Sequence, residues 1–412
     1  MSYLRLEDLI RCHRVSRQWQ AVAIANPSLY KTLDLGTYFP ASFKYDSGQS
    51  CVKMLRKYAS NDVRFLILDL SIFVYACRKG DAETYIKLCQ NLESLEIRGT
   101  SPERDVFPIA MFMSPHLRRL HAPGVRVTRD RLPGMFRRSR NLEYLCCGFD
   151  TYRHPDAIRE EQGRKKQDIP QFPLVKDLDL RLFDFGDEWD LNDILLWFPE
   201  VRKFKVSSVN TENIRYRVDR LPIRLALPWE TLESLHIANV PCRDILVYFP
   251  GSLRSLSLTG PFDYCHFITR LPMLQHLAIR SIDRIFLYKI ITAVEESMEN
   301  LLSFSYHQSD FTEGWEYFLK KGKNLASVSL SRVDYSICEL LCRLEYLEEV
   351  EFGWCEEIHV KNLLQNCADA TVECLKEIRL ISPMKLNTQT LERSRELGVV
   401  IRVEYKPFER EV

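Results

Sequence analysis

The chain has 412 residues, with 57 Lys and Arg against 56 Asp and Glu, so its formal net charge is only +1. A chain of this length can form about two or three ordinary domains or one long solenoid. The near-neutral charge implies no polyelectrolyte partner for the protein as a whole. Hydrophobic residues make up 46% of the sequence, enough for a large core. No window approaches about 18 consecutive apolar residues, so we expect no membrane span.

The N-terminal sequence MSYLRLEDL is charged where a secretory signal would be apolar. The 13 cysteines are an odd number and are scattered along the chain. We therefore expect reduced cysteines and a cytoplasmic or nuclear location.

The first 36 residues differ from the rest of the chain. The stretch LEDLIRCHRVSRQWQAVA has apolar residues at helical spacing, which predicts two short amphipathic helices. Asn26-Pro27 then interrupts the chain. Residues 37–62 are polar and contain glycine, so we expect a linker or an atypical first repeat there.

From about residue 63 to residue 405 one short pattern recurs, apolar-x-x-apolar-x-apolar, which we name the hexad. The copies recur about every 26 residues, a period typical of solenoids. Clear copies are Leu92/Leu95/Ile97, Leu232/Leu235/Ile237, Leu253/Leu256/Leu258 and Leu274/Leu277/Ile279. Weaker copies begin at Phe65, Leu117, Leu142, Val175, Val201, Leu301, Leu325, Leu347 and Leu375.

Each hexad predicts a short strand with its three apolar residues facing inward, because side chains alternate along a strand. The segments between hexads favour helices at 81–89, 193–198, 283–297 and 335–344. Strands on one side and helices on the other predict an α/β solenoid, curved like a horseshoe.

Two further segments stand apart from the repeats. Residues 151–173 are charged and contain proline and glycine, which indicates an exposed insertion. Residues 387–398 and 399–405 predict a helix and a strand that cap the last apolar face, followed by a tail at 406–412.

The hexads resemble the leucine-rich-repeat family, which implies about 12–13 degenerate repeats. Residues 347–380 are similar to the cysteine-containing subtype typical of F-box proteins. Cys355 falls at the first cysteine of that subtype, Ile358 at its next apolar position and Cys367 at its helix end. Cys89 repeats the helix-end pattern earlier in the chain.

Residues 2–35, SYLRLEDLIRCHRVSRQWQAVAIANPSLYKTLDL, resemble the second half of an F-box, and the block is similar to that of fungal F-box/leucine-rich-repeat receptors. The family's opening Leu-Pro and first amphipathic helix are not found before this block, so we expect an N-terminally truncated F-box. The matching features are Tyr3-Leu4, Asp8-Leu9, Cys12, Val15, Arg17, Trp19 and Leu29-Tyr30.

Together the two resemblances imply a substrate receptor of an SCF (Skp–cullin–F-box) ubiquitin ligase. The F-box would hold the Skp-type adaptor, and through it the cullin and RING subunits, while the repeats would hold an unidentified protein substrate. The alternative is a leucine-rich-repeat interaction scaffold that has lost adaptor binding with the first F-box helix.

The resemblance implies adaptor contacts in the N-terminal block. Trp19, with Leu9 and Val15, also fits the small domain's own core, which is the favoured role for Trp19. Leu4, Leu6 and Leu9 are the better candidates for adaptor contact. The implied adaptor-binding residues are Leu4, Leu6, Leu9, Val15 and Trp19.

The substrate would bind the concave, exposed face of the strands, where small serines leave room for a partner; the alternative is ordinary solvated sheet surface. The central position of successive hexads reads Glu96, His121, Cys146, Asp179, Lys205, His236, Ser257, Ala278, Ser305, Ser329, Glu351 and Arg379. Our candidate substrate-binding residues are Lys203, Lys205, His236, Arg280, His307, Trp354 and Arg379.

Charge is unevenly distributed: residues 101–140 carry a net +6, residues 201–224 a net +5 and residues 331–380 a net −6. Such fields steer protein partners. A basic segment is also compatible with nucleic-acid binding, but the aromatic residues that single strands stack on are not interleaved there, so we do not expect nucleic acid as a partner.

Cys355, His359, Cys367 and Cys374 have a spacing compatible with zinc. Cys355 and Cys367 match repeat positions that are usually buried, where cysteine acts as a small hydrophobe, so we expect neither a metal nor a cofactor. The chain has no phosphate loop, Rossmann fingerprint or nucleophile elbow, so we do not expect an enzyme. A catalytic site assembled across repeats remains the alternative.

Overall fold

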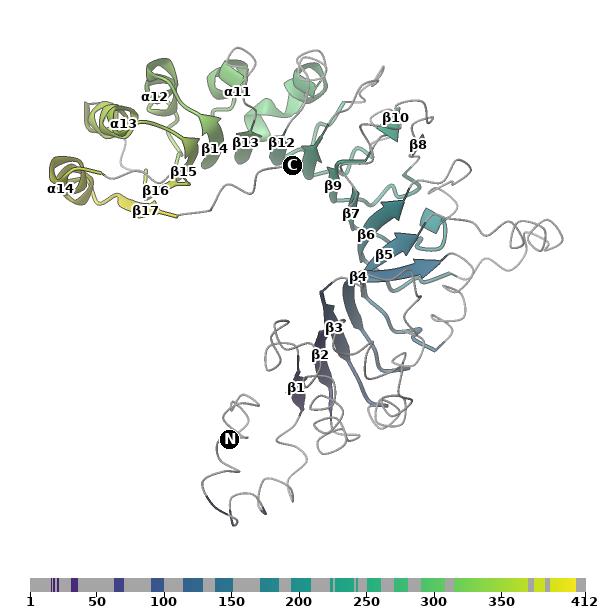
Figure 1. The fold of residues 1–412 in the computed structure, drawn as a ribbon. Coiled ribbons are helices and arrows are strands. Elements are labelled where there is room, and N and C mark those ends of the chain that lie inside the picture. Colours follow the sequence, from purple (N-terminus) through teal and green to yellow (C-terminus); the bar gives the residue numbers. More distant parts are fainter. Residues whose placement is uncertain are drawn as a thin grey trace. The chain divides into compact units, whose positions relative to one another are not determined.

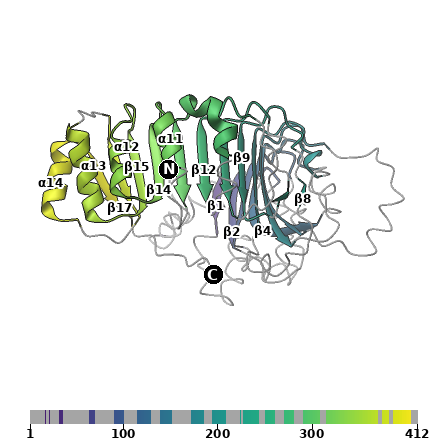
Figure 2. The same cartoon turned by 90° about the horizontal axis from the view of Figure 1, so that it is seen from above.

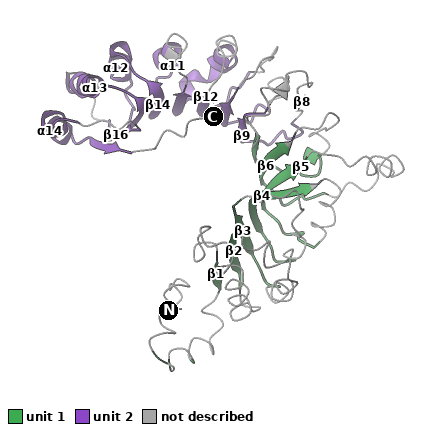
Figure 3. Ribbon diagram, in the orientation of Figure 1, with its two compact units in different colours: residues 1–210 green, residues 211–412 purple. Residues whose placement is uncertain are grey.

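The computed structural model divides the chain into two compact units, residues 1–210 and residues 211–412 (Figure 3). It describes residues 16, 18, 21, 31–35, 63–69, 90–99, 114–128, 138–150, 171–184, 194–208, 223–224, 227–240, 242–243, 250–260, 270–280, 290–307, 315–369, 374–381 and 386–404.

Unit 1 contains a parallel sheet whose strands follow one another in sequence order (Figure 1). Neighbouring strands of this sheet pair in parallel, so each connection has to return across the sheet before the next strand starts. The strands are β1 (Thr32–Asp34), β2 (Phe65–Asp69), β3 (Ser94–Arg98), β4 (Arg119–Thr128), β5 (Tyr144–Asp150), β6 (Asp177–Asp184) and β7 (Lys203–Ser208).

Unit 2 repeats this arrangement, again with parallel neighbours in sequence order. Its strands are β9 (Ser234–Ala238), β11 (Ser255–Thr259), β12 (His276–Arg280), β13 (Ser303–His307), β14 (Ser327–Arg332), β15 (Glu349–Trp354), β16 (Glu377–Leu380) and β17 (Val400–Val403). Two short strands, β8 (Ile223–Arg224) and β10 (Cys242–Arg243), form a separate parallel pair.

The helices of unit 2 lie along one side of its sheet, as both views show (Figures 1 and 2). They are a 3-10 helix (Glu295–Asn300), α11 (Trp315–Lys321), α12 (Tyr335–Leu341), α13 (Glu357–Asp369) and α14 (Thr388–Glu396). The described residues therefore have the α/β organisation expected from the sequence, with parallel strands. No helix among them is long and apolar enough to cross a bilayer.

The hexads form the strands because their three apolar side chains face the interior. Leu92, Leu95 and Ile97 are fully buried, and the residues between Leu95 and its neighbours are partly exposed. The hexad residues are likewise buried in the other clear copies and in the weaker copies from Leu117 onward, but in the copies at Leu142 and Val175 the intervening Cys146 and Asp179 are buried as well. Burying each such side chain contributes about 1.5–3 kcal/mol.

The prediction of a hexad beginning at Phe65 was wrong. Phe65 is 44% exposed and pairs with Ser94 on the opposite side of the sheet from the core. The buried residues are Val63, Leu66 and Leu68, so the hexad starts two residues earlier. Because the side-chain period is two, the rest of the strand keeps the alternation and only the starting residue moves.

The sheet also begins earlier than residue 63. Strand β1 pairs with β2, and Leu33 and Leu35 are buried like later hexad residues. The sequence contains the signal, since Tyr30-x-x-Leu33-x-Leu35 is a hexad. We missed it because residues 1–36 had been assigned as a whole to the helical segment.

An asparagine ladder joins neighbouring turns at the start of the strands. Asn324 Nδ2 donates to the carbonyl of Glu299 at 2.6 Å, and Asn141 Nδ2 to that of Pro115 at 2.7 Å. Asn300 makes the equivalent bond. Each asparagine precedes the first leucine of a hexad, so the recurring Asn-Leu has a physical cause: the amide ties each turn to the one before it.

Several helices match the sequence. Helix α12 covers most of 335–344 and begins at Asp334, whose Oδ1 accepts from the Ile337 amide at 3.0 Å. Helix α14 and strand β17 form the predicted C-terminal cap, and Asn387 caps the helix. The 283–297 segment is helical where it is described, from residue 290.

Other segments depart from the sequence or lie beyond the description. Within the segment 193–198, residues 194–195 are helical and residues 196–197 form a turn, while residue 193 lies outside the described residues; helix α11 was not predicted. Segments lying mostly or wholly outside the described residues are the F-box block 1–36, the linker 37–62, the helix 81–89, the insertion 151–173 and the tail 406–412.

We expect Phe304→Ala to lower the free energy of unfolding by about 3–5 kcal/mol, because the cavity lies between sheet and helix layer. Phe304 is fully buried, and its ring centroid lies 4.5 Å from that of Phe318 in α11. Urea unfolding followed by circular dichroism measures the change. Ser305→Ala, on the exposed face, should change it by less than about 0.5 kcal/mol; equal effects would contradict this packing.

Candidate functional site

The candidate site is the exposed face of the strands, formed by the side chains that alternate with the buried hexad residues. The strand register confirms the predicted central ladder within each unit. In unit 1 it runs Glu96, His121, Cys146, Asp179, Lys205. In unit 2 it runs His236, Ser257, Ala278, Ser305, Ser329, Glu351, Arg379.

In unit 1 the face carries a packed polar cluster that sequence reasoning missed in part. The guanidinium carbon of Arg119 lies 4.2 Å from the centroid of the Tyr144 ring, and Tyr144 Oη lies 3.0 Å from Nδ1 of His121. Burial lowers the pKa of His121 and raises that of Tyr144. Burial, and then the charge of Asp179, raise the pKa of Cys146 to about 12, so its thiol is not a nucleophile at neutral pH.

Of the predicted substrate-binding residues, Lys203 and Lys205 belong to unit 1. Lys203 is exposed at the start of β7. Lys205 Nζ lies 3.7 Å from Oδ2 of Asp179, whose side chain is largely buried, so this lysine already neutralises a carboxylate.

The other five predicted residues belong to unit 2, on β9, β12, β13, β15 and β16. Arg280 and His307 are brought together as register partners at the ends of β12 and β13. Trp354 is 59% exposed at the end of β15, beside Arg332 of β14. His236 lies on β9, with Nδ1 2.8 Å from Oγ of Ser257.

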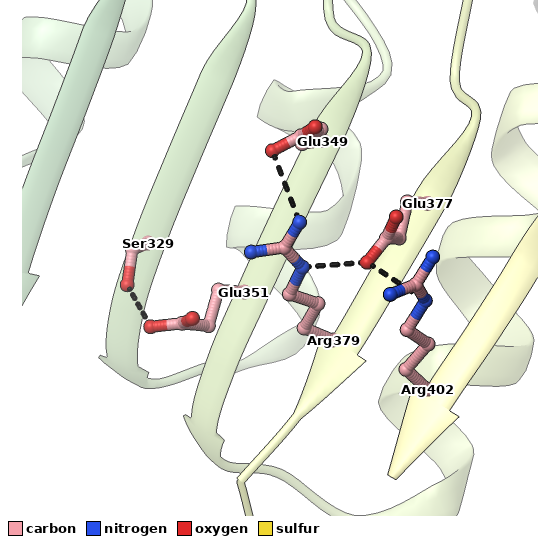
Figure 4. Close-up of polar contacts among 6 residues, drawn as sticks. All are labelled: Ser329, Glu349, Glu351, Glu377, Arg379 and Arg402. Atoms are coloured by element: carbon pink, nitrogen blue, oxygen red, sulfur yellow. Dashed lines mark hydrogen bonds and ion pairs between the residues drawn. The ribbon is translucent and has the colours of Figure 1, made fainter. Parts of the chain in front are cut away.

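A histidine, a serine and a carboxylate form a chain across three strands of unit 2. His307 Nε2 lies 2.8 Å from Ser329 Oγ, and Ser329 donates to Glu351 Oε1 at 2.8 Å (Figure 4 shows the Ser329–Glu351 bond). In a catalytic triad the serine proton goes to the histidine. Here it goes to the carboxylate, so the histidine does not activate the serine, and the chain orders the face.

Arg379 lies in an ionic ladder at the C-terminal strands (Figure 4). Its Nε is 2.5 Å from Glu377 Oε1 and its Nη2 is 3.7 Å from Glu349 Oε2. Arg402 Nε lies 3.3 Å from the same Glu377 oxygen. The hydrogen bond from Arg379 lowers the pKa of Glu377. The role of Arg379 in substrate binding stays a prediction, but its guanidinium already has two carboxylate partners.

Four cysteines of unit 2, Cys338, Cys342, Cys355 and Cys367, are buried in its interior. Cys342 Sγ and Cys367 Sγ are 3.2 Å apart, joining α12 to α13, and this hydrogen bond and burial raise the pKa of Cys342. Cys355 is buried too, whereas Ile358 is 50% exposed, unlike the apolar position that the repeat resemblance implies. The described residues contain no group of three or more side chains placed to bind a metal.

The predicted adaptor-binding residues cannot be placed on this structure. Leu4, Leu6, Leu9, Val15 and Trp19 all lie outside the described residues. Their proposed role therefore rests on the sequence.

Glu377→Gln tests the ionic ladder by pH. A lowered pKa means that the folded chain holds the ionised carboxylate more strongly than the unfolded chain. The stabilisation is therefore present above the unfolded pKa of about 4.3 and is lost as pH falls through the lower folded pKa. We expect the wild type to be more stable than Glu377→Gln at about pH 7 and the difference to shrink in urea titrations as the pH falls below the unfolded pKa of about 4.3.

Glu345→Gln provides the control for this comparison. Glu345 is exposed and makes no ion pair with a described residue. Its substitution should give no comparable pH-dependent difference. A Glu377→Gln difference that stays constant across the pH range would contradict the role of Arg379.

Comparison with known proteins identifies one segment of the chain. Residues 1–36 match the F-box-like family. A search of curated proteins finds no match. The chain therefore carries an F-box-like domain at its N-terminal end, and such a domain indicates binding of a Skp-type adaptor in an SCF-type ubiquitin ligase.

Proposed function

We propose that this protein is a substrate receptor of an SCF-type ubiquitin ligase. The F-box-like domain binds the Skp-type adaptor, which links the chain to the cullin and RING subunits, and the exposed strand face binds a protein substrate. The single observation that carries the proposal is the F-box-like match at residues 1–36. The parallel strands that follow this segment in the sequence give each unit a regularly spaced surface, which suits recognition of another protein.

The proposed substrate face has the properties of a recognition surface. Its centre in unit 2 carries small side chains that leave space for a partner backbone: Ser255, Ser257, Ala278, Ser303, Ser305 and Ser327. We propose that the hexads are leucine-rich repeats, since each one supplies a strand and its buried side chains.

The receptor role requires no catalysis by this chain. Ubiquitin transfer would take place on the other subunits, and the chain would bring the substrate to them without metal or cofactor. The described cysteines are all free thiols, which fits the proposed location in the reducing cytoplasm or nucleus.

Co-purification with a Skp-type adaptor tests the proposal. The full chain should retain the adaptor, and Leu6→Asp/Leu9→Asp should weaken binding at least about tenfold, because two carboxylates would enter an apolar interface. The matched control is Leu174→Asp/Leu302→Asp, which makes the same change at two exposed leucines of the repeats.

Three outcomes are informative in this experiment. Adaptor binding by the wild type and by the control, lost only in the Leu6/Leu9 variant, supports the ligase. Equal loss in both variants assigns the effect to general damage, which far-ultraviolet circular dichroism would reveal. An intact chain that does not bind the adaptor overturns the proposal and favours the interaction scaffold.

A further inference from the structure

Two irregularities of the unit 1 sheet converge on one place. Between β4 and β5 the register passes from Ala122 to Arg126, so three residues of β4 are extra. Between β5 and β6 it passes from Phe149/Leu182 to Asp150/Asp184, so Phe183 is extra. Bulges bend a strand, re-aim side chains and are common beside binding sites.

The first bulge decides where Arg126 points. His121 lies on the exposed face, and alternation without an insertion would bring Pro123 opposite Gly148. The insertion of three residues places Arg126 opposite Gly148 instead. Because the insertion has an odd number of residues, Arg126 moves from the buried face, which it would share with Ala122, to the exposed face. Gly148 pairs with Arg181 on its other side, so the two arginines flank the glycine in one row.

Gly148 makes room for an aromatic ring between them. A Cβ at this position would lie 2.2 Å from Cε2 of Phe183 and 2.7 Å from the carbonyl oxygen of Val125. The Phe183 ring therefore occupies space that only glycine leaves open. The guanidinium carbon of Arg126 lies 4.6 Å from the centroid of this ring. Stacking holds a guanidinium in place while leaving its N–H edge available for a planar oxyanion.

Neither arginine of this row has a matching acid. The Nε atoms of Arg126 and Arg181 are buried and have no hydrogen-bond partner, and among the described residues neither side chain makes an ion pair. Buried polar groups are nearly always bonded, so two such N–H groups in one row call for an explanation. Opposite-strand spacing puts the two Cα atoms about 10 Å apart, within reach of one shared anion.

The surrounding face carries slightly more basic than acidic residues. Across β4–β7 its basic residues are Arg119, Arg126, Arg181, Lys203 and Lys205, and its acidic ones are Asp150, Asp177, Asp179 and Asp184. The pairing of Lys205 with Asp179 uses one of each. A surplus of one basic residue therefore remains on this face, and Arg119 is stacked on an aromatic ring as Arg126 is.

We infer that this row of unit 1 binds carboxylate groups of an acidic segment in the protein substrate. The inference rests on the proposed function and names the chemistry of its substrate. Arg126 and Arg181 donate to the carboxylates.

A peptide fits this chemistry better than a nucleic acid does. Phe183 is only 4% exposed, and an arginine covers the Tyr144 ring, so these rings are poor platforms for stacking bases.

The test is fluorescence anisotropy with the full chain and a labelled glutamate-rich peptide. The wild type should bind it, and should not bind the same peptide with glutamine at each glutamate. Arg126→Gln/Arg181→Gln should weaken binding at least about tenfold. The matched control is Arg118→Gln, which removes a neighbouring exposed arginine that is paired with Glu143 and lies outside the row; it should leave binding unchanged.

Hydrogen exchange of the wild type keeps the inference testable if the double variant does not fold. Adding the glutamate-rich peptide should protect β4–β6 and leave β13–β16 unchanged. Equal binding of the glutamine peptide, equal loss in Arg118→Gln, protection only in unit 2, or preferential binding of single-stranded DNA of the same charge would each overturn it. Adaptor co-purification of the same samples is independent: an adaptor-binding chain that ignores the peptide refutes this inference alone.

Discussion

The structure depends on the burial of inward hexad side chains between neighbouring strands. A strand of five residues such as β9 or β11 cannot bury Leu235 or Leu256 by itself, and it gains a core only when the next strand stacks beside it. The parallel register then follows from the repeat, because equivalent leucines lie opposite one another. A single constraint therefore sets both the core and the even spacing of the exposed face.

Polar side chains at the strand starts strengthen this stacking without serving a partner. Arg64 pairs with Glu93 at 3.7 Å, and Lys376 pairs with Glu348 at 2.8 Å, each across neighbouring strands. Such exposed pairs contribute about 0–1 kcal/mol each. In these pairs each charged side chain has a partner of opposite charge, whereas the Nε atom of Arg181 has no hydrogen-bond partner.

The two units use their faces differently. In unit 2 polar groups satisfy one another, as in the His307–Ser329–Glu351 chain and the carboxylates around Arg379. In unit 1 Arg119 and Arg126 stack on aromatic rings, and the Nε–H groups of Arg126 and Arg181 have no hydrogen-bond partner. Polar groups that already have a hydrogen-bond partner gain little from binding another protein, whereas donors without a partner gain a full hydrogen bond. The exposed face of unit 1 therefore gains more from a bound partner, although most predicted contacts lie in unit 2.

The sequence by itself determined the strand positions, the central ladder and the C-terminal cap, because apolar spacing is a local property that neighbours repeat. It misplaced the hexad at Phe65, because the apolar residues there fit two alignments. It missed β1, because that strand lies in a segment that was interpreted as helical. The row around Gly148 was decided by tertiary structure alone. Bulges depend on how two strands pair. The spacing of apolar residues within one strand therefore does not predict that Arg126 lies on the exposed face.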